Sequence, residues 1–279
     1  AEKEIISEIV FNTSMTGYLE ILTDPSYAGQ AVAMTYPLIG NYGVCPKDME
    51  SERPWPDALI VRELARVPSN FRSGMSLDAF LKENGIPGIA GIDTRALTKI
   101  LRGSGTMNGM ITTEEYPNLE EVVSRIKEYR VSGVVARVSC KEKYTMGVED
   151  FVPTDYEEAC MTYMAGRSMR AAIENAKQAG VSLGEIAMYS VQKSAGIEKL
   201  NAAAACPGKA GKRYRVAMMD FGTKKNMQHC LQKYGCEVTV YPADTSAEEI
   251  LAGGYDGIML SNGPGDPAEC VDIIKEVKK

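Results

Sequence analysis

The segment 260–267 constrains the fold of this chain more than any other feature. An apolar strand at 257–260 ends in an Asn-Gly-Pro-Gly turn at 262–265. The Asp-Pro pair that follows has the order typical of a helix N-cap and first helical position. Gly263 and Gly265 have no Cβ, so their amides can approach a ligand closely. A tight strand-to-helix turn without any ligand is the competing interpretation of this pattern.

The residues before this turn alternate between strand and helix patterns. Strands are predicted at 215–219, 236–241 and 257–260, with a helix at 224–234 and a second helix that starts at a capping box on Ser246. This order predicts a parallel, doubly wound α/β sheet, in which ligands bind beyond the carboxyl ends of the strands.

Three strands with their helices make only half of such a domain. We therefore expect an incomplete α/β domain with an uncovered apolar edge and sheet face. The last helix, which follows the Asp-Pro pair, is expected to face inwards with Val271, Ile274 and Val277.

The first part of the chain mixes short strands with capped helices, which predicts an α+β domain. Ser76 and Asp93 are the expected N-caps of two helices. The middle part is acidic and then alanine-rich, which predicts an atypical helical insertion that ends in a linker. The predicted strands of the first part are 5–11, 30–35, 58–61 and 133–138, and the predicted domains are 1–143, 144–212 and 213–279.

Composition excludes several classes of protein. A net charge of -6 with interspersed signs argues against a nucleic-acid-binding surface. No apolar run approaches the ~18 residues that a membrane span needs, and the amino terminus lacks the pattern of a signal peptide. The seven cysteines show no CxxC spacing, so we expect reduced thiols, no metal site and a cytoplasmic location. The chain starts almost directly in a strand, so we expect residues before Ala1.

A set of long motifs, in matching order, resembles the small, glutamine-hydrolysing subunit of carbamoyl phosphate synthetase. The resemblance covers about 1–143 and 212–279. Its motifs are Phe-Asn-Thr-Ser-Met-Thr-Gly-Tyr at 11–18, Leu-Thr-Asp-Pro-Ser-Tyr at 22–27, Ser-Asn-Phe-Arg at 69–72, Gly-Ile-Asp-Thr-Arg-Ala-Leu-Thr at 91–98, Asp-Phe-Gly at 220–222 with Lys-Asn at 225–226, and the turn at 260–267.

This resemblance implies a class I glutamine amidotransferase that forms a heterodimer with a large synthetase subunit. The small subunit frees ammonia from glutamine and uses no cofactor, and the large subunit consumes ATP and bicarbonate. The resemblance implies that Ser26 and Gly265 bind glutamine, and that Gly263 binds it and contributes an oxyanion-hole amide. Without the resemblance, the Asp-Pro-Ser sequence favours a turn residue at Ser26 over a ligand-binding one. The product would enter pyrimidine or arginine biosynthesis.

The sequence departs from the family at the catalytic residues. The family's cysteine lies in a GxCxGxQ elbow, followed by a histidine and a glutamate, and none of these follows the turn here. The only histidine, His229, is expected to be a surface or packing residue, and Cys270 is expected to be a helix residue near the capped end. We therefore expect no catalytic residue in these 279 residues, no glutaminase activity from them alone, and further chain beyond Lys279.

Two other functions stay open from the sequence. An amidotransferase subunit of anthranilate synthesis would share the Gly-Pro-Gly turn but not the motif at 11–18. A non-catalytic docking or regulatory protein would keep the domain that binds the large subunit and lack the catalytic residues.

Overall fold

The structure of the protein, a computed structural model, describes residues 4–150 and 213–279. Within these residues no helix combines the length and the hydrophobicity needed to cross a membrane. The chain divides into two compact units. The described residues of the first unit are 4–144, 217–227 and 240–279, and those of the second are 145–150, 213–216 and 228–239.

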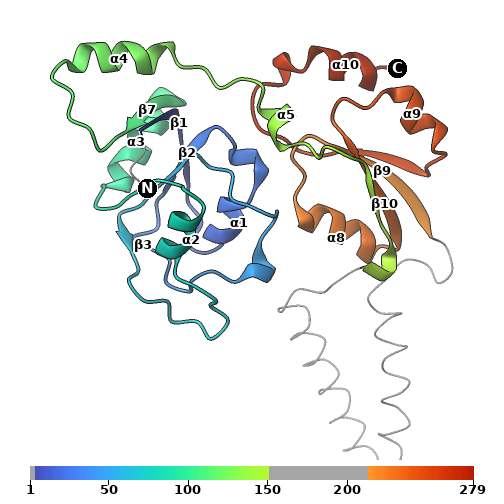
Figure 1. The fold of residues 1–279 in the computed structure, drawn as a ribbon, viewed down its shortest axis with the longest axis horizontal. Helices are drawn as coiled ribbons and strands as arrows, with labels where there is room; N and C mark the ends of the chain where they lie inside the picture. Colours follow the sequence, from blue (N-terminus) through green and yellow to red (C-terminus); the bar gives the residue numbers. More distant parts are fainter. Residues whose placement is uncertain (1–3, 151–212) are drawn as a thin grey trace, which may run out of the picture. The chain divides into compact units, whose positions relative to one another are not determined.

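Five strands of the first unit form a mixed sheet with the order β6-β4-β2-β1-β7. Figure 1 labels β1, β2 and β7 of this sheet. Four neighbouring strands of this sheet are parallel, and β7 is antiparallel to β1. Short strands and helices are both present in this unit, and its α+β class stays a prediction. The strands are β1 (Ile5–Asn12), β2 (Gln30–Met34), β4 (Ala58–Ile60), β6 (Gly88–Ile89) and β7 (Met107–Ile111), and a small parallel pair joins β3 (Leu38–Ile39) to β5 (Glu63–Leu64).

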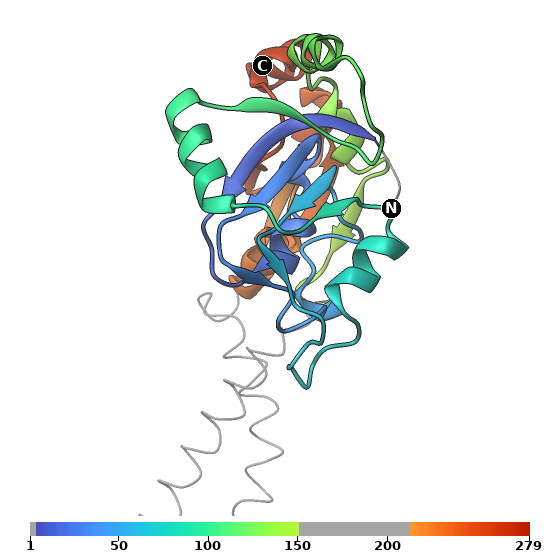
Figure 2. The same cartoon turned by 90° about the vertical axis from the view of Figure 1, so that its left-hand side faces the viewer.

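The central strand β2 separates two cores because its side chains alternate between the faces of the sheet. Val32 and Met34 pack with the helices α1 (Tyr18–Leu22) and α2 (Leu77–Glu83). Ala31 and Ala33 face the other side, where Leu101 of α3 (Thr94–Ser104) packs. Figure 2 shows α2 and α3 on opposite sides of the sheet. A further helix, α4 (Leu119–Glu128), follows β7.

The predicted helix N-caps are confirmed. Ser76 Oγ accepts a hydrogen bond from Ala79 N at 3.2 Å, and Asp93 Oδ1 accepts one from Ala96 N at 3.0 Å. Such side chains satisfy amides that a helix leaves without an internal partner.

The capping box on Ser246 is formed in part. Ser246 Oγ accepts from Glu249 N at 3.2 Å at the start of α9 (Ala247–Ala252). The Glu249 carboxylate lies 3.0 Å from Lys143 Nζ, so it pairs with this ammonium group rather than reaching back to the cap.

The strand predicted at 133–138 is wrong, because these residues form the helix α5 (Val134–Val138). Val134 and Val138 are four residues apart, lie on one helical face and are buried in a cluster with Ala28. Gly133 precedes the helix with a φ of 63°, which turns the chain into it. Tertiary packing of the two valines thus outweighs the strand propensity of a β-branched run.

The last part of the chain contributes to a four-stranded sheet with the order β11-β9-β10-β8. β9 lies between β10 and β11, the two strands that follow it in the chain. This is the order of strands at a doubly wound switch point. The elements are β8 (Tyr144–Met146), β9 (Tyr214–Asp220), α8 (Lys225–Lys233), β10 (Cys236–Pro242) and β11 (Gly257–Leu260).

The second unit includes the start of the predicted helical insertion, and residues 151–212 of that insertion lie outside the described residues. Here Gln232 Nε2 donates to Gly147 O at 2.7 Å, and the Thr145 and Thr239 hydroxyls lie 3.0 Å apart. These contacts fasten the strand β8 and the turn after it within this unit.

The end of the chain differs from the expectation. The Asp-Pro pair at 266–267 caps and starts a 3₁₀ helix, η4 (Pro267–Glu269), and α10 (Val271–Val277) begins only after Cys270. The expected inward face of α10 is wrong, because Val271, Ile274 and Val277 are 52%, 37% and 44% exposed. Ile258 and Leu260 on β11, at the edge of the sheet, are exposed as well.

The helical state of 133–138 predicts which substitutions the protein tolerates. Ala136→Lys should change the free energy of unfolding by no more than about 0.5 kcal/mol, because Ala136 is exposed on α5. Val138→Lys should cost roughly 3 kcal/mol or more, because it buries an unpaired charge. Urea unfolding measures both values. A strand would place the two side chains on one face and make both substitutions severe, which would contradict the helix.

Candidate functional site

Two turns meet at the carboxyl ends of neighbouring strands. β9 ends at Asp220 and β11 ends at Leu260. Ser261 N donates to Met219 O at 3.1 Å, and Ser261 Oγ accepts from Phe221 N at 2.9 Å. The turn after β9 and the Asn-Gly-Pro-Gly turn are therefore joined at the sheet edge where the sequence predicts a ligand.

A buried carboxylate organises the turn after β9. Asp220 Oδ1 accepts from Gly222 N at 2.9 Å and from Thr223 N at 2.7 Å. Its other oxygen accepts from Cys140 N at 2.7 Å, so it also fixes the segment that follows α5. Three amide donors satisfy a carboxylate that is only 5% exposed.

The glycines of the second turn are required by the protein's own packing. A Cβ on Gly263 would lie 2.2 Å from the carbonyl oxygen of Phe221. A Cβ on Gly265 would lie 2.8 Å from Val134 Cγ2, and the φ of Gly265 is 80°. Close packing against the Phe221 carbonyl and the Val134 side chain thus explains both glycines.

Ser26 lies beside this turn, although it is far away in sequence. It belongs to the 3₁₀ helix η1 (Pro25–Tyr27), and its amide donates to the capping oxygen Asp24 Oδ1 at 2.9 Å. Asn262 Nδ2 donates to Ser26 Oγ at 2.5 Å. The structure therefore brings Ser26 to the residue that precedes Gly263, with Gly265 two positions further along the turn.

The structure adds a cation that the sequence did not single out. Lys224 Nζ lies 3.3 Å from Asp24 Oδ2, so Asp24 joins the Ser26 amide and the Lys224 ammonium through its two oxygens. Lys224 lies between the Asp-Phe-Gly and Lys-Asn motifs at 220–226. This position between two family motifs is the sequence feature that could have identified Lys224 as a site residue. Asp24 thus contacts both the ammonium group and the residue that carries the hydroxyl, and an ammonium group and a hydroxyl are both suited to binding a carboxylate.

The loop at Glu50 holds the helix that follows Lys224. Glu50 O accepts from Lys225 N at 2.8 Å, and Glu50 Oε2 accepts from Asn226 N at 3.0 Å. Glu50 thus caps the amino-terminal amides of α8, where a negative charge is favoured. Together with the Asp24 pair, this contact fixes Lys224 from both sides.

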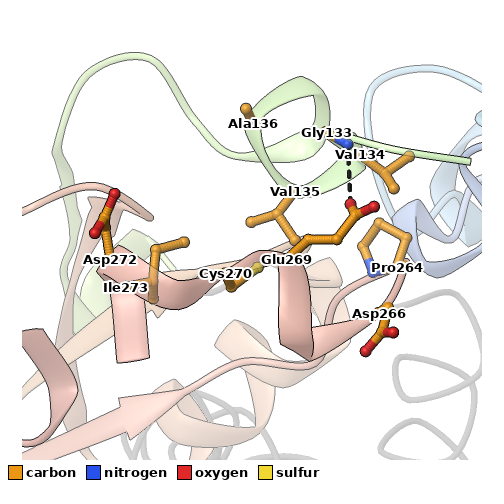
Figure 3. Close-up of a pocket in the computed structure, with 11 residues that line it drawn as sticks. Gly133, Val134, Val135, Ala136, Pro264, Asp266, Glu269, Cys270, Asp272 and Ile273 are labelled. Atoms are coloured by element: carbon orange, nitrogen blue, oxygen red, sulfur yellow. Dashed lines mark hydrogen bonds between the residues drawn. The ribbon is translucent and has the colours of Figure 1, made fainter. Parts of the chain in front are cut away.

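A cavity of about 180 Å³ lies next to the Gly-Pro-Gly turn. The start of α5 lines one wall, and Pro264, Gly265 and residues of η4 and α10 line the other. Figure 3 shows Glu269 turned towards Gly133, where its Oε2 accepts from the amide at 3.2 Å. Cys270 also lines the cavity, and it lies between η4 and α10 rather than within a helix, so the expectation of a helix residue is wrong.

The described residues hold no group of three or more His, Cys, Asp and Glu side chains that could bind a metal ion. His229 lies half-buried on α8 in the second unit. The turn residues belong to the first unit.

Comparisons with known proteins match two segments of the chain to two families. Residues 1–111 match the family model of the carbamoyl-phosphate synthase small chain, CPSase domain, and residues 217–279 match that of class-I glutamine amidotransferase. The carbamoyl phosphate synthase small chain of Clostridium perfringens is 38% identical over 277 residues, which cover 99% of this chain and 61% of the relative.

Other relatives give the same result. The small chain of Listeria monocytogenes is 40% identical over 278 residues, covering 100% of this chain and 59% of the relative. That of Chlorobaculum tepidum is 39% identical over 279 residues, covering 98% and 60%. This chain thus spans about 60% of the length of these relatives.

The turns at the strand ends and the matched segment that contains them define a class I glutamine amidotransferase domain. With its amino-terminal match and its relatives, the chain belongs to the family of carbamoyl phosphate synthase small chains.

Gly263→Ala should destabilise the protein by about 1–3 kcal/mol, because the new methyl group overlaps a backbone oxygen that cannot move independently. Gly257→Ala on β11 is the matched control, since a Cβ there meets nothing within 4 Å. Urea denaturation of both variants measures the difference. Equal stabilities would contradict the close packing of the Gly263 turn against Phe221.

Cys140 should react slowly with thiol reagents. Burial and the neighbouring Asp220 raise the pKa of Cys140 to about 12 from its usual 9.0, so its thiolate is scarce at pH 8. The neutral thiol is favoured in the folded protein, and its contribution to stability is lost as the pH rises from about 9 to about 12. Mass-spectrometric mapping after iodoacetamide treatment should show exposed Cys230 modified before Cys140. Faster modification of Cys140 would contradict the raised pKa.

Proposed function

We propose that this chain supplies the glutamine-binding part of a glutamine-dependent carbamoyl phosphate synthetase. The single observation that carries the proposal is the contact of Ser26 with Asn262, which brings an amino-terminal hydroxyl to the amidotransferase turn. In this proposal glutamine binds to Ser26, Gly263 and Gly265. The large subunit is the partner protein, and the chain binds neither nucleic acid nor a membrane.

The chemistry of these groups suits glutamine. The Ser26 hydroxyl and the Lys224 ammonium offer a hydrogen-bond donor and a positive charge to the α-carboxylate of the substrate. The Gly263 amide stabilises the oxyanion that forms when the side-chain amide of glutamine is attacked. Pro264 restricts the backbone of the turn, so the Gly263 amide is held in place for this role.

These 279 residues do not include the nucleophile and base that the family's reaction needs. A thiol nucleophile needs a base or a cation to form the thiolate, and the sequence has one histidine and no GxCxGxQ elbow. We therefore propose that the chain as given does not hydrolyse glutamine by itself.

The remaining parts of the proposal follow from the family. Ammonia released from glutamine passes to the large subunit, which uses ATP and bicarbonate, and the small subunit needs no cofactor. The two subunits form a cytoplasmic heterodimer that serves pyrimidine or arginine biosynthesis. The proposed organisation is an α+β domain at 1–143, an insertion at 144–212 and an incomplete α/β domain at 213–279.

The test measures glutamate release from glutamine in the presence of the large subunit. The complete natural gene product should release glutamate, and the 279-residue chain should not exceed a control without enzyme. In the complete protein, Ser26→Ala should raise the KM for glutamine roughly tenfold with little change in kcat, because a hydrogen bond to a charged group is lost. Ser124→Ala, exposed on α4, is the control.

Each other outcome has a defined meaning. Glutamate release by the 279-residue chain would refute its inactivity. A complete protein that binds the large subunit and releases no glutamate would favour the docking protein over the amidotransferase. An unchanged KM in Ser26→Ala would remove Ser26 from the glutamine site.

A further inference from the structure

Asn262 occupies a special position between the two halves of the proposed site. It follows β11 and directly precedes Gly263, and its side chain reaches Ser26, which lies 236 positions earlier in the chain. The Nδ2–Oγ distance of 2.5 Å is short for a bond of this kind. Sequence reasoning gave Asn262 no role beyond membership of the turn.

The direction of this hydrogen bond decides what Ser26 can do. A serine hydroxyl has one proton to donate and two lone pairs to accept with. Asn262 donates to the hydroxyl oxygen and occupies a lone pair, while Asp24 Oδ1 takes the Ser26 backbone amide. Neither contact uses the hydroxyl proton. Ser26 is therefore prepared to act as a donor.

We propose that Asn262 is a positioning residue that holds the Ser26 hydroxyl as a donor to the substrate carboxylate. The assignment rests on the proposed function, because it concerns the same glutamine site. A donor whose own oxygen accepts a hydrogen bond is polarised, and the bond that it gives is strengthened. Asn262 thereby makes the site selective for a substrate with a carboxylate over one with a neutral carboxamide at that position.

Lys224 and Asn262 divide this task. The ammonium group of Lys224 attracts the negative charge from any direction, and it is held by Asp24. Asn262 sets the direction of the hydroxyl bond. Loss of Asn262 leaves the charge of the site unchanged and removes the orientation of Ser26, so its effect should depend on the presence of the Ser26 hydroxyl.

The experiment uses the complete natural gene product assembled with its large subunit. Asn262→Ala should raise the KM for glutamine about fivefold and leave kcat within about twofold, because ground-state binding is weakened. Asn262→Asp should raise it further, to roughly 30-fold, because a carboxylate accepts the Ser26 proton and repels the substrate. Glu248→Ala, exposed on α9, controls for a general effect of a surface substitution.

A double-mutant cycle separates positioning from a general structural role. If Asn262 acts through Ser26, then Asn262→Ala should add less than about twofold to the KM of Ser26→Ala. Effects that multiply, or an unchanged KM in both Asn262 variants, would overturn the assignment. A second readout is selectivity: the preference for glutamine over its α-carboxamide, measured as a ratio of kcat/KM, should fall in Asn262→Asp and not in Glu248→Ala.

The proposed function and this assignment fail in different ways. Absence of glutaminase activity from the unaltered complex would overturn the proposed function and the role of Asn262 together. Glutaminase activity with an unaltered preference for the carboxylate in Asn262→Asp would overturn the role of Asn262 alone. Equal melting temperatures of the Asn262 variants and the unaltered protein show that a changed KM does not come from unfolding.

Discussion

The buried carboxylate of Asp220 is the interaction on which the site depends most. It accepts two amides of its own turn and one from Cys140, so one side chain fixes the chain leaving β9 and the segment that follows α5. Burying this carboxylate without such donors would destabilise the fold by several kcal/mol. Conformations of the two segments that remove the donors are therefore disfavoured. The position of Phe221 follows from it, and Phe221 in turn contacts Ser261 and Gly263.

The amino-terminal sheet supplies the other half of the site by placing one short helix. Val32 and Met34 bury the apolar face of α1, and α1 ends where Asp24 begins the turn that carries Ser26. Small alanines on the opposite face of β2 allow α3 to pack closely. The core therefore determines where Ser26 lies. The contacts of Ser26 with Asn262 and of Asp24 with Lys224 then join this segment to the turns that follow β9 and β11.

Local rules predicted the parts of the fold that depend on neighbouring residues. Ser76, Asp93 and Ser246 cap their helices because a cap needs only the next few amides. The strand at 133–138 was wrong for the opposite reason. A run of valines favours a strand locally, and only burial against Ala28 selects the helical face that contains Val134 and Val138.

The sequence by itself determined the family, the alternation of strands and helices from β9 to β11, and the residue types of the proposed glutamine site. These features depend on contiguous motifs such as the turn at 260–267, which can be recognised without the tertiary structure. Tertiary structure decided which of these residues meet. The bond between Asn262 and Ser26 joins positions 236 residues apart, and the pair of Lys224 with Asp24 joins two different motifs. No local pattern encodes such pairs, because their geometry depends on how the sheets and their helices pack.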